Sequence, residues 1–289
     1  MRDVRVAELA GRQFNRVSRQ QLLGLGLSER TIDRAIATGR LAVVEMGVFA
    51  VPPVLQHDDW GRWMGATLTA PGTGLSHESA AAAYGFWSLR RRYETVTRRG
   101  NGGPRRHGGI LVYRSSTLAG NRDRLNGIPI TSVGRTVIDL AAHQSSKALA
   151  RSVREAIRLE LTSLDALGDC LGRHHGRRGA GRLGATIARY AGLPLEQARS
   201  GAEIRALEVL RAAGRELPRL NARIAGEEAD LSWPRHHLII EIDGRPFHLD
   251  KGEDARKQGR WEAAGWTVRR LPSGDVYEHP HRLLTLAPP

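Results

Sequence analysis

Hydrophobic residues in the first 60 positions recur first with the spacing of short helices and then with the alternation of a hairpin. Apolar residues in RVAELAGRQF follow a helical period. Ser18 and Ser28 stand as N-caps before two short helices predicted at 19–23 and 29–38, and glycines follow both helices. RLAVVE and GVFAV predict a hairpin. Two short helices joined by a glycine turn, with a hairpin after them, predict a winged helix-turn-helix domain over residues 1–60.

Residues 61–198 mix helical and strand patterns and predict an α/β middle domain. We expect a capped, alanine-rich helix in GLSHESAAAAYGFW, strands in YETVTRR and ILVYRSS, and a strand in GIPITSVGRTVIDLAAH followed by a helix from about Gly134. Asp139 on that helix is interpreted as a surface or packing residue. Gly100 to Gly109 predict a flexible basic loop. Two further helices precede a basic connector, RHHGRRGAGR.

Residues 199–289 predict a separate small α/β domain. SGAEIRALEVLRAAG has the period of a helix, and PRLNARI, EADLSW and HLIIEIDG have the composition of strands. DARKQGRWEAAG predicts a helix, WTVRRLP a strand and DVYEHPHRLL a last helix. The whole chain is therefore expected to be a multidomain α+β protein.

The charge of the chain is unevenly distributed. Its formal net charge is +14 and its pI is about 11.1. Residues 1–199 hold 30 Lys+Arg and 16 Asp+Glu, whereas residues 200–289 hold 14 of each. Excess positive charge favours a polyanionic partner, and arginine is a strong bidentate donor to phosphate. We therefore expect double-stranded DNA to bind the first 199 residues.

Other function classes are excluded by what the sequence lacks. Cys170 is the only cysteine, so neither an intramolecular disulfide nor a thiolate metal cluster can form. No stretch resembles a signal peptide or approaches the ~20 apolar residues that span a bilayer. We expect a cytoplasmic protein with no membrane partner.

The predicted DNA contacts lie on the second short helix and on the basic loop. In a helix-turn-helix the second helix enters the major groove with its N-terminal residues at base edges. The residues expected to be exposed there are Ser28, Glu29, Arg30, Thr31, Asp33 and Arg34. Arg105 and Arg106 of the loop either track a phosphate backbone or stay solvated. A protein-interaction module is the alternative interpretation of the helices.

A different chemistry is indicated where the apolar run LII meets two carboxylates. An ionised carboxylate is costly to bury unless a cation, a proton or hydrogen bonds compensate it. Since strand side chains alternate, Glu241 and Asp243 are expected on one face, within reach of Asp230 on the neighbouring strand and Glu203 on the preceding helix. Such an oxygen set suits Mg²⁺ or Mn²⁺, which can activate a water for phosphodiester hydrolysis.

These residues resemble the very-short-patch-repair-like (Vsr-like) branch of the PD-(D/E)xK restriction-endonuclease superfamily. The resemblance rests on Asp230, on Glu241-x-Asp243-Gly244, on Phe247-His248, and on the basic helix and GWTVRRL that follow. It implies a metal site of Asp230, Glu241 and Asp243, with His248 as general acid or base. Asp243 stands where the parent superfamily has a lysine, so a non-cleaving domain is the alternative.

The front and middle of the chain resemble winged-helix antitoxins of the abortive-infection AbiEi type. The resemblance rests on SRQQLLGLGLSERTIDRAIATGRL and GIPITSVGRTVIDLAA. It implies a DNA-binding regulator whose partner is a cognate toxin or a second copy of the chain.

Each site residue also has a structural alternative. Glu203 has capping-box spacing from Ser200, Asp243-Gly244 suits a turn, and His248 suits a structural role. The basic residues of the following helix either contact the scissile phosphate or form a solvated face: Arg256, Lys257 and Arg260.

Three functions are compared. A Mg²⁺-dependent endonuclease, in phage defence or DNA repair, is favoured because its acidic and histidine residues are all present. A regulator or antitoxin with an inactive nuclease fold and a protein-interaction scaffold are the alternatives.

Overall fold

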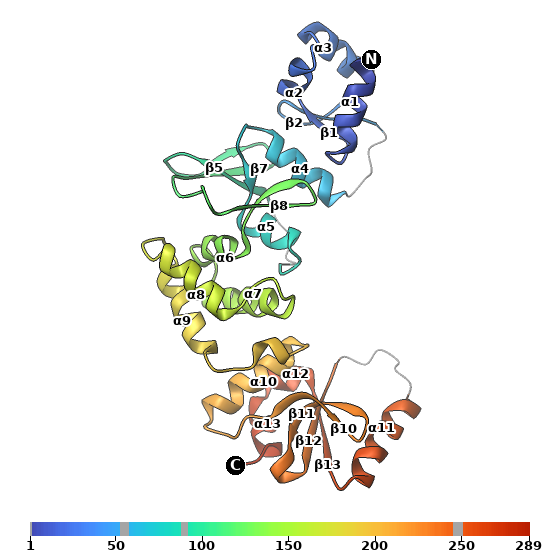
Figure 1. Cartoon of the computed structure of the whole chain (residues 1–289), viewed down its shortest axis with the longest axis vertical. Coiled ribbons are helices and arrows are strands. Elements are labelled where there is room, and N and C mark those ends of the chain that lie inside the picture. Colours follow the sequence, from blue (N-terminus) through green and yellow to red (C-terminus); the bar gives the residue numbers. More distant parts are fainter. Residues whose placement is uncertain (1, 53–57, 88–91, 245–250) are drawn as a thin grey trace. The chain divides into compact units, whose positions relative to one another are not determined.

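The computed structural model describes residues 2–52, 58–87, 92–244 and 251–289 (Figure 1). It is an α+β protein, with 46% helix and 22% strand, and the strands of the described residues form three separate sheets. Packing divides the chain into two compact units. The first contains residues 1–152 and 166–184, and the second contains residues 153–165 and 185–289. The division into three domains stays a prediction.

The first part of the chain folds as two capped helices and a small sheet. Its elements are α1 (Arg2–Gly11), β1 (Arg16–Ser18), α2 (Arg19–Gly24), α3 (Glu29–Ala37), β2 (Ala42–Glu45) and β3 (Val48–Ala50). The predicted helices are confirmed as α2 and α3, and the hairpin as β2 and β3. The N-H of Gln21 donates to the Ser18 hydroxyl, and that of Thr31 to the Ser28 hydroxyl, as the cap prediction requires. Strand β1 was not predicted, and it pairs with β3.

The middle of the chain builds a six-stranded sheet with helices after it. The elements are α4 (Asp59–Leu68), β4 (Gly74–Leu75), α5 (His77–Ala83), β5 (Glu94–Arg99), β6 (Arg105–His107), β7 (Ile110–Ser115), β8 (Arg122–Leu125), β9 (Ile128–Thr131), α6 (Val133–Ala141), α7 (Ser146–Arg158), α8 (Leu164–Arg173) and α9 (Ala180–Tyr190). The strand order is β6-β7-β5-β4-β9-β8. Apolar residues of α4 and of the central strands form its core, including Trp63, Leu75, Val96 and Ile130.

Two local predictions for this region were wrong, and one helix was missed. The loop Gly100–Gly109 contains strand β6, which pairs antiparallel with β7, so part of it is ordered by the sheet. The basic connector leads into helix α9, which was not predicted. Helix α5 lacks the expected side-chain cap, because the Ser76 hydroxyl instead contacts Thr97 and His77.

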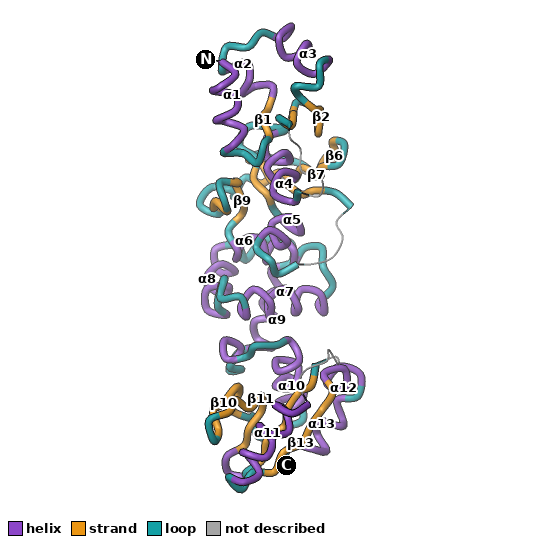
Figure 2. The backbone as a smooth tube through the Cα atoms, turned by 90° about the vertical axis from the view of Figure 1, so that its right-hand side faces the viewer, coloured by secondary structure: helices purple, strands orange, loops and turns teal. Residues whose placement is uncertain are grey.

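The last part of the chain is one four-stranded sheet with helices on both faces. Its elements are α10 (Gly201–Ala212), β10 (Arg219–Ile224), β11 (Glu227–Trp233), β12 (Leu238–Asp243), α11 (Lys251–Ala263), β13 (Thr267–Pro272), α12 (Ser273–Glu278) and α13 (Pro280–Leu286). The predicted order of helices and strands is confirmed, except that two helices, α12 and α13, stand where one last helix was predicted. Strands β10, β11 and β12 pair antiparallel, and β13 pairs parallel with β12. Helix α11 covers one face, and α10, α12 and α13 lie toward the other (Figures 1 and 2).

Two buried tryptophans hold this sheet to its surroundings. Trp233 and Trp261 are both 0% exposed. Their indole N-H groups donate to the carbonyl oxygens of Glu216 at 2.9 Å and Ile224 at 3.0 Å, so no buried donor is left unpaired by their burial. Trp261 anchors α11, and this fixes the helix face that carries Lys257.

In the described part of the chain, no helix has the length and apolar character needed to cross a bilayer.

Candidate functional site

Asp230 and Glu241 meet where strands β11 and β12 separate. The ladder between these strands ends at Leu231 and Ile240. One residue further, the N-H of Asp230 donates to Oε1 of Glu241 at 3.0 Å, and the N-H of Ile242 donates to Oδ2 of Asp230 at 2.8 Å. Each carboxylate therefore takes a strand N-H that the ladder no longer uses, and the two acidic side chains are held side by side.

The nearby positive charge does not fully compensate the two neighbouring carboxylates, and the pKa of Asp230 reflects this. The pKa of Asp230 is raised to about 6, first by burial and then by the negative charge of Glu241, with a smaller contribution from Glu203. The N-H of Ile242 and the charge of Lys257 oppose the shift. A half-buried acid that titrates near neutral pH beside a second acid is typical of a functional site.

Lys257 on helix α11 supplies the cation of the site. Its Nζ lies 2.8 Å from Oε2 of Glu241 and 4.6 Å from the centroid of the Trp261 ring. The sequence predicted Lys257 as a DNA contact, and the structure brings its ammonium to the carboxylates. Arg260 on the same helix pairs with Glu227, and Arg256 is exposed.

Asp243 and Glu203 are less available as metal ligands than the sequence suggested, because both already have partners. Arg270 lies 3.0 Å from Oδ1 of Asp243 and 3.5 Å from Oδ2 of Asp254. Asp243 therefore has a cationic partner of its own.

Glu203 has two hydrogen-bond donors on one oxygen. Its Oε2 accepts from the N-H of Arg199 at 2.9 Å and from Nδ2 of Asn221 at 2.8 Å. The first bond closes the start of helix α10 and the second ties that helix to β10. The structural alternative for Glu203 thus describes its contacts, although its charge still acts on Asp230.

The donor set fits a small divalent cation held by two carboxylates. Mg²⁺ is commonly bound through one or two carboxylates, with waters and substrate phosphate completing its shell. Asp230 and Glu241 offer that arrangement. Within the described residues no group of three or more His, Cys, Asp or Glu is arranged to hold a metal. Phe247 and His248 lie outside the described residues.

The predicted DNA-facing side of α3 is exposed, as expected. Ser28, Glu29, Arg30, Thr31, Asp33 and Arg34 are all exposed. Arg19 pairs with both acidic residues, Glu29 and Asp33. The hydroxyls of Ser28 and Thr31 lie 2.8 Å apart and bond each other. Arg30 and Arg34 form no ion pair with any described residue, so their charges are exposed and uncompensated on this side of α3.

A basic groove of about 700 Å³ lies in the same unit. Its lining includes Glu45, Met46, Arg98, Arg105, Arg106, His107 and Arg114. The Arg106 guanidinium lies 4.9 Å from the centroid of the Tyr93 ring, and its Nε donates to the carbonyl of Gly108 at 3.2 Å. Both predicted loop arginines, Arg105 and Arg106, therefore line a groove on an ordered edge strand.

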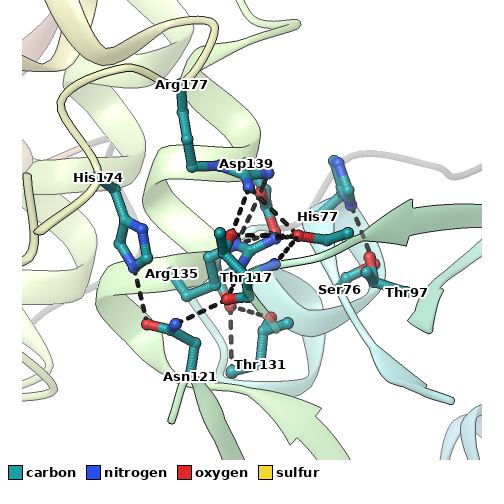
Figure 3. Close-up of polar contacts among 12 residues, drawn as sticks. Ser76, His77, Thr97, Thr117, Asn121, Thr131, Arg135, Asp139, His174 and Arg177 are labelled. Atoms are coloured by element: carbon teal, nitrogen blue, oxygen red, sulfur yellow. Dashed lines mark hydrogen bonds and ion pairs between the residues drawn. The ribbon is translucent and has the colours of Figure 1, made fainter. Parts of the chain in front are cut away.

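Sequence reasoning missed a buried polar cluster in the middle part (Figure 3). Asp139 is only 2% exposed and pairs with Arg135, which is 0% exposed, so the surface interpretation of Asp139 was wrong. A signal was present: an arginine and an aspartate stand four positions apart in an otherwise apolar helix, where they face each other. Charged side chains in an apolar helix are costly to bury unless they pair with each other, so their spacing predicts a buried ion pair at Arg135 and Asp139.

Comparison with known proteins found no family model that matches the chain and no curated protein that matches it.

Proposed function

We propose that the protein is a Mg²⁺-dependent endonuclease that binds double-stranded DNA and hydrolyses its phosphodiester bonds. In this proposal residues 1–60 form a winged helix-turn-helix, residues 61–198 a basic middle domain, and residues 199–289 a restriction-endonuclease-like domain. The observation that carries the proposal is the grouping of Asp230, Glu241 and Lys257 at the point where β11 and β12 separate.

Asp230 and Glu241 would hold the cation, which when bound supplies Lewis acidity and a more acidic water. Water adds to phosphorus, the bond from phosphorus to the leaving sugar oxygen breaks, and that oxygen takes up a proton. Negative charge accumulates on the phosphoryl oxygens as this happens. Lys257, held by Glu241 and by the face of Trp261, is positioned to donate to one of those oxygens.

Lys257 takes over a role that the strand does not supply. Asp243 stands where the resembled superfamily has a lysine. An ionised carboxylate has neither a hydrogen-bond donor nor a positive charge to offer a phosphate. The amine reaches the site from helix α11 instead. His248 is the candidate for the proton transfers, as the resemblance implies.

Affinity for the duplex would come from the basic part of the chain. Arg30 and Arg34 of α3 are the exposed cations that face outward, and the basic groove adds Arg98, Arg105 and Arg114. Neutralising phosphates releases counterions, so binding by such a surface falls steeply with salt. Phage defence and DNA repair are the cellular settings to which the resemblance points.

Single-turnover cleavage of duplex DNA tests the proposal. Wild type with Mg²⁺ is expected to cut, and Asp230→Asn and Glu241→Gln are expected to lose cutting and the calorimetric heat of Mn²⁺ binding. Glu227→Gln is the matched control, since Glu227 pairs with Arg260 and takes no part in the proposed chemistry. Cutting by both site variants at the wild-type rate would contradict the proposal.

A second candidate is a regulator or antitoxin whose nuclease fold is inactive, with a cognate toxin or a second copy as partner. The observation that favours it is internal charge pairing: Lys257 already engages Glu241, and Arg270 already engages Asp243. In that case the wild type binds duplex DNA but never cuts it with Mg²⁺ or Mn²⁺.

A further inference from the structure

The middle part of the chain encloses a cavity of about 150 Å³ that the proposed nuclease activity does not use. Its lining is rich in arginine, histidine and hydroxyl groups. It includes His77, Thr97, Tyr113, Arg114, Ser115, Arg135, Asp139, His143, Arg177 and Arg178. These residues come from α5, β5, β7, α6 and the segments that follow α6 and α8, and all belong to the first compact unit.

Two guanidinium groups share one carboxylate in the wall of this cavity (Figure 3). Nε of Arg135 donates to both oxygens of Asp139, at 2.9 and 3.0 Å. Arg177 donates to Oδ1 of the same residue at 2.9 Å. Other N-H groups of Arg135 and Arg177 donate to Ser115 and Thr117. Arg135 and Arg177 thus bond to Asp139 and its neighbours, and Arg114 and Arg178 bring two further guanidinium groups to the wall.

The cavity therefore carries an excess of positive charge. Four arginines line it, at positions 114, 135, 177 and 178, against the single carboxylate of Asp139. Burial lowers the pKa of Arg177, and the charge of Asp139 only partly opposes this. Four arginines that face one carboxylate are only partly compensated in charge, so the cavity favours the entry of an anion.

One of the two histidines of the cavity, His77, adds a polar group in an unusual backbone conformation. His77 is buried and has φ +49°, a region that non-glycine residues seldom adopt and that often marks functional positions. Its Nδ1 lies 2.9 Å from the Ser76 hydroxyl, and its ring stacks on Tyr113 with centroids 3.8 Å apart. Nε2 of His77 has no hydrogen-bond partner among the described residues, so one ring nitrogen stays available to a ligand.

We propose that this cavity binds a phosphate-class oxyanion, either free phosphate or the phosphate group of a monoester. Guanidinium groups match the oxygens of phosphate in pairs, which favours this anion over a halide. The volume is below the roughly 300–1,000 Å³ of pockets that enclose drug-sized ligands, so the cavity would enclose the phosphate group alone. The site is independent of the proposed nuclease activity.

Calorimetry of the full chain with inorganic phosphate tests this site. Arg177→Gln removes a half-buried guanidinium of the wall and is expected to weaken binding about tenfold or more, as for loss of a charged hydrogen bond. Because Arg177 also holds Asp139, Arg178→Gln is the second variant: it is exposed, lines the cavity and leaves the buried pair intact. Arg151→Gln, exposed on α7 and outside the lining, is the matched control.

The expected result is binding in wild type and Arg151→Gln, with weaker binding in both cavity variants. Titrations with deoxyadenosine monophosphate, and with deoxyadenosine as the control that lacks a phosphate, distinguish a monoester ligand from free phosphate. Tighter binding of the monophosphate than of phosphate identifies a monoester ligand, and binding of phosphate alone identifies the free ion. No heat with phosphate or the monophosphate in wild type, or equal affinity in Arg178→Gln and Arg151→Gln, overturns the proposal.

Discussion

Lys257 places its ammonium 2.8 Å from Oε2 of Glu241, although one residue lies on helix α11 and the other on strand β12. Arg270, on the strand beside β12, instead pairs with Asp243. The two acids of Glu-x-Asp thus have different partners: the charge of Lys257 also acts on Asp230, whereas Arg270 also lies near Asp254. On the same strand, Glu241 is therefore a candidate catalytic group, and Asp243 belongs to a structural ion pair with Arg270.

Lys257→Gln is expected to slow single-turnover DNA cleavage by about 10²–10³-fold, because a donor to developing phosphoryl charge is lost. The heat of Mn²⁺ binding should persist, since the two carboxylates remain. Arg260→Gln makes the same charge change on the same helix, in an exposed pair outside the site, and should cut at nearly the wild-type rate. Equal slowing of cleavage in both variants would show that the rate depends on the total charge of the helix and not on a donor at position 257.

Asp230→Asn is expected to stabilise the fold at pH 8 and to change it little at pH 4. The folded pKa of Asp230 is about 6, above the unfolded value, so its favourable contribution is complete below about pH 4 and is lost as pH rises through 6. At pH 8 the ionised acid therefore costs on the order of 1–3 kcal/mol, which the neutral amide avoids.

Urea unfolding at the two pH values measures this difference. Asp165→Asn, an exposed acid of the same unit, is the control and should shift the free energy of unfolding by less than about 0.5 kcal/mol. A less stable Asp230→Asn protein at pH 8 would mean that the carboxylate is compensated in the folded state.

The double variant Arg30→Gln/Arg34→Gln is expected to weaken binding to duplex DNA and to flatten its salt dependence. Each lost phosphate contact changes the slope of log K against log salt by about 0.9, so two contacts change it by about 1.8. Fluorescence anisotropy at several salt concentrations measures the slope. Arg5→Gln/Arg151→Gln removes the same charge from exposed positions outside α3 and should keep the wild-type slope.

Acid is expected to destabilise the first unit through His77. Burial lowers the pKa of His77 to about 4, and Asp139 on α6 only partly opposes this, while the nearby His143, Arg135 and Arg177 also lower it. The folded state then binds fewer protons than the unfolded state, so stability is complete above about pH 6.5 and is lost as pH falls toward 4.

Between pH 7 and pH 5 this loss is about 2 kcal/mol for the single group. His77→Asn, a residue that tolerates positive φ, should remove most of that loss. His175→Asn, at an exposed histidine of the same unit, should keep the wild-type pH dependence. Identical pH profiles for the two variants would mean that another group is responsible.

Elements that depend on near neighbours in the chain were predictable. Ser28 caps α3, the helix and strand order after residue 199 follows from periodicity, and Asp230 and Glu241 meet because a short hairpin joins their strands. Helix caps, hydrophobic periods and tight hairpins depend on residues only a few positions apart, so they can be predicted from the sequence.

Contacts between distant segments required the tertiary structure. Strand β6 forms because it pairs with the edge of β7. Asp139 is buried in a cluster in which Arg177, from a distant segment, donates to its carboxylate. Lys257 reaches Glu241 because the buried Trp261 fixes helix α11 against the sheet. The charge of a residue is visible in the sequence, but its partner, its burial and hence its pKa depend on which segments pack together. Local patterns along the chain therefore identify the candidate acids of this protein, and the packing of distant segments assigns a cation to each of them.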